Sequence, residues 1–423
     1  MASFAPEIKI RFIMEYRSFA EGVPGVLALC AGVLMCAMCG KDADCPDGGN
    51  HEEVPPPHSD TLYVTGVEYP AGYDWVKDPE YGTVPCRLFM EKEGERIVEI
   101  PVGYSYETAS DPDMHRCAQG HLYTDYSTDS ETVIKRDGVE LFRYPGREMI
   151  SGFYVSDSTD VYTLGQPRSG GSGFTFRRNG KVLLDVPSGC AVSDISEKDG
   201  RVYLVYRTDV LSDGSGLKRQ GYYIYADGGS SLLVGISSNE EILHAVVQNG
   251  QPVCVLGGTD GSPSGSECFF RNGTRYAIET EGLGALVYCR ILYDDDDVFL
   301  SGVCRSAVSG ECTYAVWDGY GKHMYSLASG QLPFYSFACS GNIYDFTGQA
   351  TSFDDMTCHM NGKQLYSYGR NLSTYGSRPA AVCRDSLYFI FSDRTERRQP
   401  YVAVQDRLTA GGFNGFYTGV SAW

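Results

Sequence analysis

Short apolar segments joined by glycine turns recur along this chain. In FTFRRNGKVLLDV, residues 174–186, two such segments flank Asn179-Gly180. Asn-Gly and Asp-Gly pairs suit two-residue hairpin turns, because both central residues need a positive φ that glycine adopts freely and Asn or Asp tolerates. The pattern therefore predicts β-hairpins.

The hairpins repeat with a nearly constant period. The first glycines of the successive turns are Gly94, Gly138, Gly180, Gly228, Gly273, Gly319 and Gly362. A degenerate copy follows at Asp406-Arg407. A second motif keeps the same period about twenty residues upstream, a strand with an aromatic second or third residue. Its aromatic residues are Tyr63, Tyr123, Tyr162, Tyr203, Phe299, Tyr344 and Tyr388. We expect these rings to pack between adjacent repeats.

The repeat predicts an all-β fold, an eight-bladed β-propeller. With the apolar stretch that precedes each aromatic strand, every unit holds four antiparallel strands in about 45 residues, which is the length of a propeller blade. The first unit lacks its first strand, and a spare strand lies at residues 414–420. We expect this strand to pair with the first blade and close the ring. Seven blades is the alternative, if the degenerate copy is only a closing ribbon.

Composition agrees with strands and excludes one class of partner. The chain has 50 Gly and 31 Tyr residues, which favour strands and tight turns over helices. Its 54 acidic and 35 basic side chains give a net charge of −19. Because this charge repels a phosphate backbone, we expect no nucleic-acid partner.

The N-terminus has the pattern of an export signal. Basic residues precede an uncharged apolar run at 23–39, and a polar, Pro-rich stretch follows. The run ends in Cys39, followed by GKDAD, and here the chain resembles bacterial lipoproteins, particularly those of the Bacteroidetes. The resemblance implies lipidation at Cys39, with Cys36 as the alternative, and acidic residues soon after it imply export to the surface.

The predicted organisation has three parts. Residues 1–38 are a lipoprotein signal peptide, 39–60 an acidic and Pro-rich tether, and 61–423 the propeller. The expected location is the outer membrane, with the protein attached to the bilayer only through its lipid anchor and facing the cell surface or the periplasm.

The most distinctive loop is aromatic and acidic. YPAGYDWVKDPEYG, residues 69–82, joins the second and third strands of the first blade, and long loops of this kind gather on one face of the disc. Sugars stack on aromatic rings and their hydroxyls donate to carboxylates. The candidate ligand-binding residues are Tyr69, Tyr73, Asp74, Trp75 and Tyr81. The alternative is that these rings fold back and hold the loop in place.

No catalytic or metal-binding signature accompanies the repeat. Neither G-x-S-x-G nor H-E-x-x-H occurs, the seven histidines form no close pair, and we assign no catalytic residues, metal or cofactor. Calcium binding at Asp294–Asp297 has weak support, because the alternating ligands of a calcium loop are absent. Two disulfides are possible by hairpin proximity, Cys304 with Cys312 and Cys254 with Cys268.

These features favour a binding protein over an enzyme. We expect a surface-anchored propeller of the adhesion type that recognises a glycan or a cell-envelope protein through its loop-rich face. The alternatives are a carbohydrate-active enzyme, a glycoside hydrolase or polysaccharide lyase with acids at the channel mouth, and a structural subunit of an outer-membrane complex. Carboxylates within hydrogen-bonding reach of an Arg or His at the channel would favour the enzyme.

Overall fold

The described structure is a computed structural model and covers most of the repeat region. The described residues are 61–75, 84–102, 115–128, 130–156, 159–167, 173–186, 190–212, 218–233, 240–258, 267–294, 297–348, 356–369, 372–374, 378–393 and 399–422. They form β-strands, turns and loops, and none of them belongs to a helix that is long and apolar enough to span a membrane.

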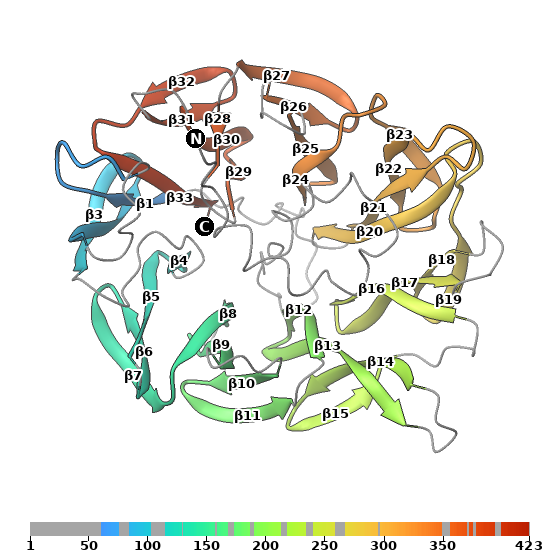
Figure 1. Ribbon diagram of the computed structural model, residues 1–423, viewed down its shortest axis with the longest axis horizontal. Coiled ribbons are helices and arrows are strands. Elements are labelled where there is room, and N and C mark those ends of the chain that lie inside the picture. Colours follow the sequence, from blue (N-terminus) through green and yellow to red (C-terminus); the bar gives the residue numbers. More distant parts are fainter. Residues whose placement is uncertain are drawn as a thin grey trace, which may run out of the picture.

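Eight antiparallel sheets surround a common axis, so the fold is an eight-bladed β-propeller (Figure 1). The predicted eight blades are therefore confirmed. The strands nearest the axis are β33 (Gly415–Ala422), β4 (His115–Ala118), β8 (Glu148–Val155), β12 (Cys190–Lys198), β16 (Glu240–Gln248), β20 (Ala285–Asp294), β24 (Pro333–Cys339) and, in the eighth blade, β28 (Leu372–Ser373) with β29 (Ala380–Cys383).

The remaining strands of each blade follow outward in chain order. The second strands are β1 (Leu62–Glu68), β5 (His121–Ser127), β9 (Val161–Pro167), β13 (Arg201–Ser212), β17 (Gln251–Gly258), β21 (Asp297–Arg305), β25 (Asn342–Thr347) and β30 (Ser386–Asp393). The third strands are β2 (Cys86–Lys92), β6 (Glu131–Arg136), β10 (Phe174–Arg178), β14 (Lys218–Ala226), β18 (Cys268–Arg271), β22 (Cys312–Asp318), β26 (Met356–Met360) and β31 (Pro400–Val404). The fourth strands are β3 (Glu95–Val102), β7 (Val139–Pro145), β11 (Lys181–Val186), β15 (Gly229–Leu232), β19 (Thr274–Ala277), β23 (His323–Ser326), β27 (Lys363–Gly369) and β32 (Arg407–Ala410).

The two ends of the propeller chain close the ring in the first blade. Strand β33 pairs antiparallel with β1, from Leu62 opposite Ala422 to Glu68 opposite Gly415. The C-terminal strand thus supplies the inner strand that the first blade lacks, as the sequence predicts. This pairing leaves the inner edge of β1 covered.

Asn-Gly and Asp-Gly turns join the third strand to the fourth strand within a blade, and their geometry explains why these residues recur in the sequence. Asn179 and Gly180 both have positive φ, at 48° and 79°. The Asn179 side-chain oxygen also accepts a hydrogen bond of 2.8 Å from the backbone N–H of Val161, at the start of the second strand. Asp137 holds Leu122 in the same way. The recurring Asn or Asp therefore sets the turn and caps the neighbouring strand.

The hydrophobic core lies mainly between the blades. Phe176 of the third blade packs edge-on against Tyr225 of the fourth, with ring centroids 5.8 Å apart. The repeated aromatic residues belong to these interfaces: a Cβ at Gly120 of the second blade would lie 2.9 Å from the hydroxyl of Tyr63 in the first. Blade-to-blade packing is the role that we predict for these rings.

Candidate functional site

The aromatic loop that we predict as a ligand site is largely packed against the protein. The side chains of Tyr69 and Trp75 are only 4% and 3% exposed, and both belong to the hydrophobic cluster of the first blade. Tyr73 and Asp74 are half-buried, and Tyr81 lies outside the described residues. The ring faces of Tyr69 and Trp75 are therefore covered by protein in this structure.

These rings hold the loop against the closing strand. Trp75 contacts Phe416 of β33 with ring centroids 4.9 Å apart. The backbone N–H of Tyr69 donates to the carbonyl oxygen of Asn414, and the Asn414 side chain donates to the carbonyls of Pro70 and Tyr73. We call residues 69–75 with Asn414 and Phe416 the closure latch. The latch matches the alternative interpretation of the loop.

A different set of polar residues lies on the inner strands of the fourth, fifth and sixth blades. Asp194, His244 and Arg290 each stand four residues before the last pair of the hairpin between first and second strands. They therefore occupy the same level on three neighbouring strands around the axis, β12, β16 and β20 (Figure 1). All three side chains are half-buried.

A second level of polar groups lies three residues closer to the tight turns. The hydroxyl of Tyr293, on β20, donates to Oδ1 of Asp194 at 3.1 Å. The hydroxyl of Tyr154, on β8, donates to Oε2 of Glu197 at 2.9 Å. Together we call Tyr154, Asp194, Glu197, His244, Arg290 and Tyr293 the axial cluster. It joins the inner strands of four consecutive blades.

Asp194 is the most connected member of the axial cluster. Its Oδ2 accepts from the backbone N–H of Val247 on β16 at 3.3 Å, while its Oδ1 accepts from Tyr293. The neighbouring Ser196 donates to the carbonyl of the same Val247 at 2.8 Å. Both carboxylate oxygens thus have protein donors, which fixes the orientation of the group.

Burial dominates the electrostatics of the axial cluster. Desolvation raises the pKa of Asp194 to about 7, although hydrogen bonds from Val247 and Tyr293 and the charge of Arg290 act in the opposite direction. Desolvation, together with the Arg290 charge, lowers the pKa of His244 to about 3. His244 is therefore neutral near pH 7, and its Nδ1 accepts from the backbone N–H of Ile291 at 3.4 Å.

The axial cluster lies toward the face of the tight turns. In the fourth blade the short turns at Gly200 and Gly228 join first to second and third to fourth strands, so both fall at one end of the antiparallel strands. The connection between β13 and β14 falls at the other end. Counted by register, Glu197 and Tyr293 lie near the tight-turn face, opposite the loop-rich face.

Two further buried polar groups hold blades together. Asp345, fully buried between the sixth and seventh blades, accepts hydrogen bonds from the hydroxyls of Tyr314 and Tyr325, each at 2.7 Å, and of Ser336 at 2.6 Å. In the third blade Arg177 forms a bidentate, buried ion pair with Glu148, with N–O distances of 2.7 and 2.8 Å. Since hydrogen bonds satisfy these charges internally, we assign them to structure.

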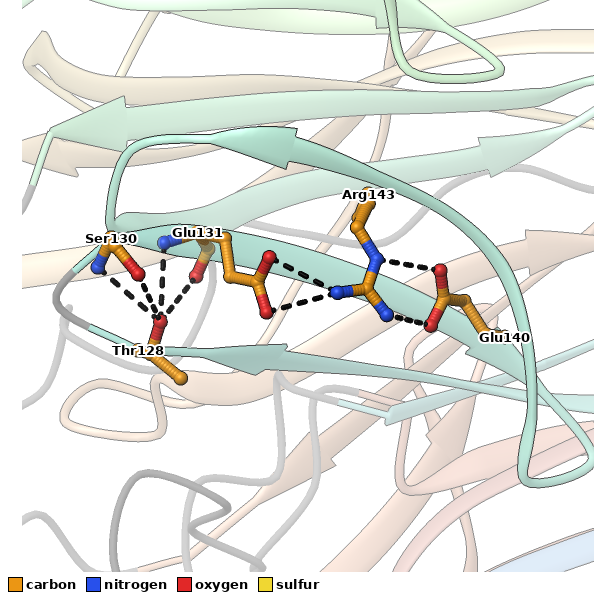
Figure 2. A network of polar contacts seen from close by, with 5 residues as sticks. All are labelled: Thr128, Ser130, Glu131, Glu140 and Arg143. Atoms are coloured by element: carbon orange, nitrogen blue, oxygen red, sulfur yellow. Dashed lines mark hydrogen bonds and ion pairs between the residues drawn. The ribbon is translucent and has the colours of Figure 1, made fainter.

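An exposed ion-pair network on the second blade is also structural. Arg143 on β7 binds Glu140 and Glu131, while the Thr128 hydroxyl accepts from the backbone N–H groups of Ser130 and Glu131 (Figure 2). Arg143 is 54% exposed, and surface pairs of this kind contribute little to stability.

The described residues contain no group of three or more His, Cys, Asp or Glu side chains placed to hold a metal ion. The candidate calcium stretch is described only at its ends, since Asp295 and Asp296 lie outside the described residues. We assign no metal to this site.

The predicted disulfides are not formed, and all four cysteines are free thiols. Cys304 stands opposite Thr313, whereas Cys312 stands opposite Arg305, so the two thiols point to opposite faces of the sheet. Cys254 stands opposite Phe270 and Cys268 opposite Leu256. This diagonal arrangement separates the Cα atoms of the second pair by about 7–8 Å, more than a disulfide normally spans.

Comparison with known proteins supports the fold and nothing finer. No protein-family model matches the chain, and no curated protein matches its sequence. Among solved structures, the dihydro-heme d1 dehydrogenase NirN in complex with DHE is 11% identical, with a TM-score of 0.52, over 85% of this chain and 75% of that one. The β-propeller domain of the trilobed protease from Pyrococcus furiosus is 13% identical, with a TM-score of 0.42, over 71% and 93%.

Sequence reasoning missed the axial cluster, although a signal was available. Asp194, His244 and Arg290 coincide when the first strands are aligned on the turns that follow them. At the same level the seventh blade has Tyr335. A polar residue repeated at this level in three consecutive blades is the pattern that an alignment of blades, rather than a search for motifs, would have revealed.

Proposed function

We propose that this protein is an exported, lipid-anchored binding propeller that recognises a glycan or a cell-envelope protein. The axial cluster is the recognition surface in this proposal. The closure latch has a structural role, because Tyr69 and Trp75 are covered by protein. Tyr73, Asp74 and the loop-rich face remain a second surface that a large ligand would reach.

The observation that carries the proposal is the convergence of fixed donors and acceptors on the propeller axis. Carboxylates, a guanidinium group, an imidazole and two phenol groups lie on the inner strands of four consecutive blades around it. Hydroxyl-rich ligands need such a mixture of donors and acceptors held in place. Both oxygens of Asp194 already have protein donors, which favours a binding framework over a reactive acid.

A glycan-array screen of the purified full chain tests the recognition of glycans. We expect binding that Glu197→Gln weakens and that Glu140→Gln, an exposed acid on the outer strand β7, leaves unchanged. A pull-down from envelope extracts with the same variants tests the protein partner. If neither experiment gives binding that depends on Glu197, the proposal fails.

The lipid anchor is tested separately at Cys39. Cys39→Ala should abolish palmitate labelling and release the protein from the membrane fraction. Labelling that persists in Cys39→Ala and disappears in Cys36→Ala would move the anchor to Cys36. Labelling that persists when both residues are replaced would refute lipidation at either cysteine.

A carbohydrate-active enzyme is the second candidate, and the pKa of Asp194 favours it. A carboxyl group with a pKa of about 7 exchanges a proton readily at neutral pH, as a general acid or base must. The test is release of reducing ends, or of unsaturated products, from polysaccharides. Loss of that release in Asp194→Asn with binding retained would favour the enzyme.

A further inference from the structure

We infer that the axial cluster binds an acidic sugar through its carboxylate group, with Arg290 and His244 as the donors. This inference rests on the proposed function, because it names the chemical class of ligand for the same site. It follows from the proton positions and the charges in the axial cluster.

The neutral imidazole ring of His244 carries one N–H group. Its Nδ1 accepts from the backbone N–H of Ile291, so a neutral ring carries its proton on Nε2. Arg290 lies at the same level of the next strand. Its guanidinium group has five N–H donors and contains no acceptor atom. Neighbouring strands β16 and β20 therefore present an N–H donor beside a fixed positive charge.

Asp194 lies at the same level on β12. Burial raises the pKa of Asp194 to about 7, so this carboxyl group is partly protonated near pH 7. Its two oxygens accept from Tyr293 and Val247. Arg290 supplies a positive charge at the level of Asp194 and His244, and its planar donors fit a carboxylate in a bidentate geometry.

The axial cluster also contains hydrogen-bond acceptors. Tyr293 and Tyr154 donate their hydroxyl hydrogens to Asp194 and Glu197, so the lone pairs of both phenol oxygens accept hydrogen bonds. Glu197 adds a carboxylate at the level of these two tyrosines. The axial cluster thus contains acceptors for sugar hydroxyls as well as donors for a carboxylate, which is the combination that a uronate residue requires.

The chain's net charge of −19 limits this recognition to short range. An acidic polymer is repelled by the protein as a whole, so its affinity must come from contacts inside the site. We therefore expect binding to strengthen, or to stay constant, as salt is raised. An exposed basic surface would show the opposite dependence.

The experiment is a binding titration of the full chain, in detergent, with oligosaccharides of galacturonate, glucuronate and mannuronate, each beside its neutral methyl ester. We expect at least one acid to bind and its ester to bind about tenfold or more weakly, the loss expected for one charge-assisted contact. Arg290→Gln should cause a similar loss, and Arg290→Lys a smaller one. His244→Gln should weaken binding while the positive charge of Arg290 stays in place.

Arg143→Gln and His323→Gln are the matched controls, because both residues lie on outer strands, and they should leave the affinity unchanged. Melting temperatures identify variants that do not fold. Esters that bind as well as acids would overturn the inference and leave the proposed glycan recognition intact. If neither acids, esters nor other arrayed glycans bind, glycan recognition itself fails.

Discussion

Trp75 and Phe416 lie in ring contact, 4.9 Å between centroids, although 341 positions separate them in the chain. Trp75 belongs to the loop after the first described strand, and Phe416 to the last. Their contact therefore adds side-chain packing to the backbone pairing of β33 with β1. The loop therefore packs on the closing strand, which explains why its aromatic side chains are buried.

Replacing Trp75 tests the closure latch. Trp75→Ala removes a buried indole and should lower the free energy of unfolding by about 3–5 kcal/mol, the usual cost of such a truncation. Urea unfolding measures it. Tyr320→Ala, at a ring that is 61% exposed, is the control and should cost less than about 1 kcal/mol. Equal effects of the two substitutions would show that the latch is not needed.

Asp345 offers a test of the buried network between the sixth and seventh blades. It stands at the fourth position of its strand, where other blades have buried apolar residues such as Leu204, Leu300 and Phe389. Asp345→Leu restores that pattern but deprives three hydroxyl groups of their acceptor. We expect a loss of at least about 3 kcal/mol in urea unfolding.

Removing the partners as well should recover most of this loss. Tyr314→Phe, Tyr325→Phe and Ser336→Ala, combined with Asp345→Leu, eliminate the hydroxyl groups together with the acid, and apolar replacement of a whole buried network is often close to neutral. If the combined variant is less stable than Asp345→Leu alone, desolvated hydroxyls are not the cause.

Opposing pH dependences are expected from Asp194 and His244. The pKa of Asp194 rises from 3.8 to about 7 on folding, so its contribution to stability is full below about pH 4 and is lost as pH rises to about 7. The pKa of His244 falls from 6.5 to about 3, so its contribution is full above about pH 6.5 and is lost as pH falls toward 3. The two offset each other over most of this range.

Single variants should reveal each dependence. In Asp194→Asn the remaining His244 should make stability rise more steeply with pH between about 4 and 6.5 than in the parent protein. In His244→Gln, stability should fall relative to the parent over the same range. Urea unfolding at several pH values measures both slopes. Slopes that match the parent would mean that these groups keep ordinary pKa values in the folded protein.

Gly165 permits the buried pair of Glu148 and Arg177. A Cβ at Gly165 would lie 1.7 Å from Oε2 of Glu148, so Gly165→Ala must displace the carboxylate from Arg177. We expect a loss of at least about 3 kcal/mol, the cost of breaking a buried pair. Gly229→Ala, in a strand position with open space around it, is the control and should change the melting temperature little.

The blade pattern could be predicted because its causes are local. Positive φ at Asn179-Gly180, and the side-chain cap on Val161, depend on residues within one blade. Each blade repeats them, so the period was visible without any knowledge of long-range contacts. The closing strand was visible too, because the first blade lacked a strand and the C-terminus had one to spare.

The site could not be predicted in the same way, because exposure is decided by other parts of the chain. Trp75 is the type of residue on which sugars stack, and only its contact with Phe416 shows that its ring is covered. Cys304 and Cys312 are close in sequence, and only the strand register shows that they point to opposite faces.

The sequence by itself determined an all-β propeller closed by its last strand, with eight blades predicted and seven as the alternative, since turns and alternating strands depend on neighbouring residues. Only the tertiary structure decided which residues meet at the axis. Asp194 and Tyr293 are 99 positions apart and two blades apart, and they come together because curvature of the ring turns the inner strands toward a common centre. The repeat places Asp194, His244 and Arg290 at one level, but the contact between Asp194 and Tyr293 depends on the three-dimensional ring.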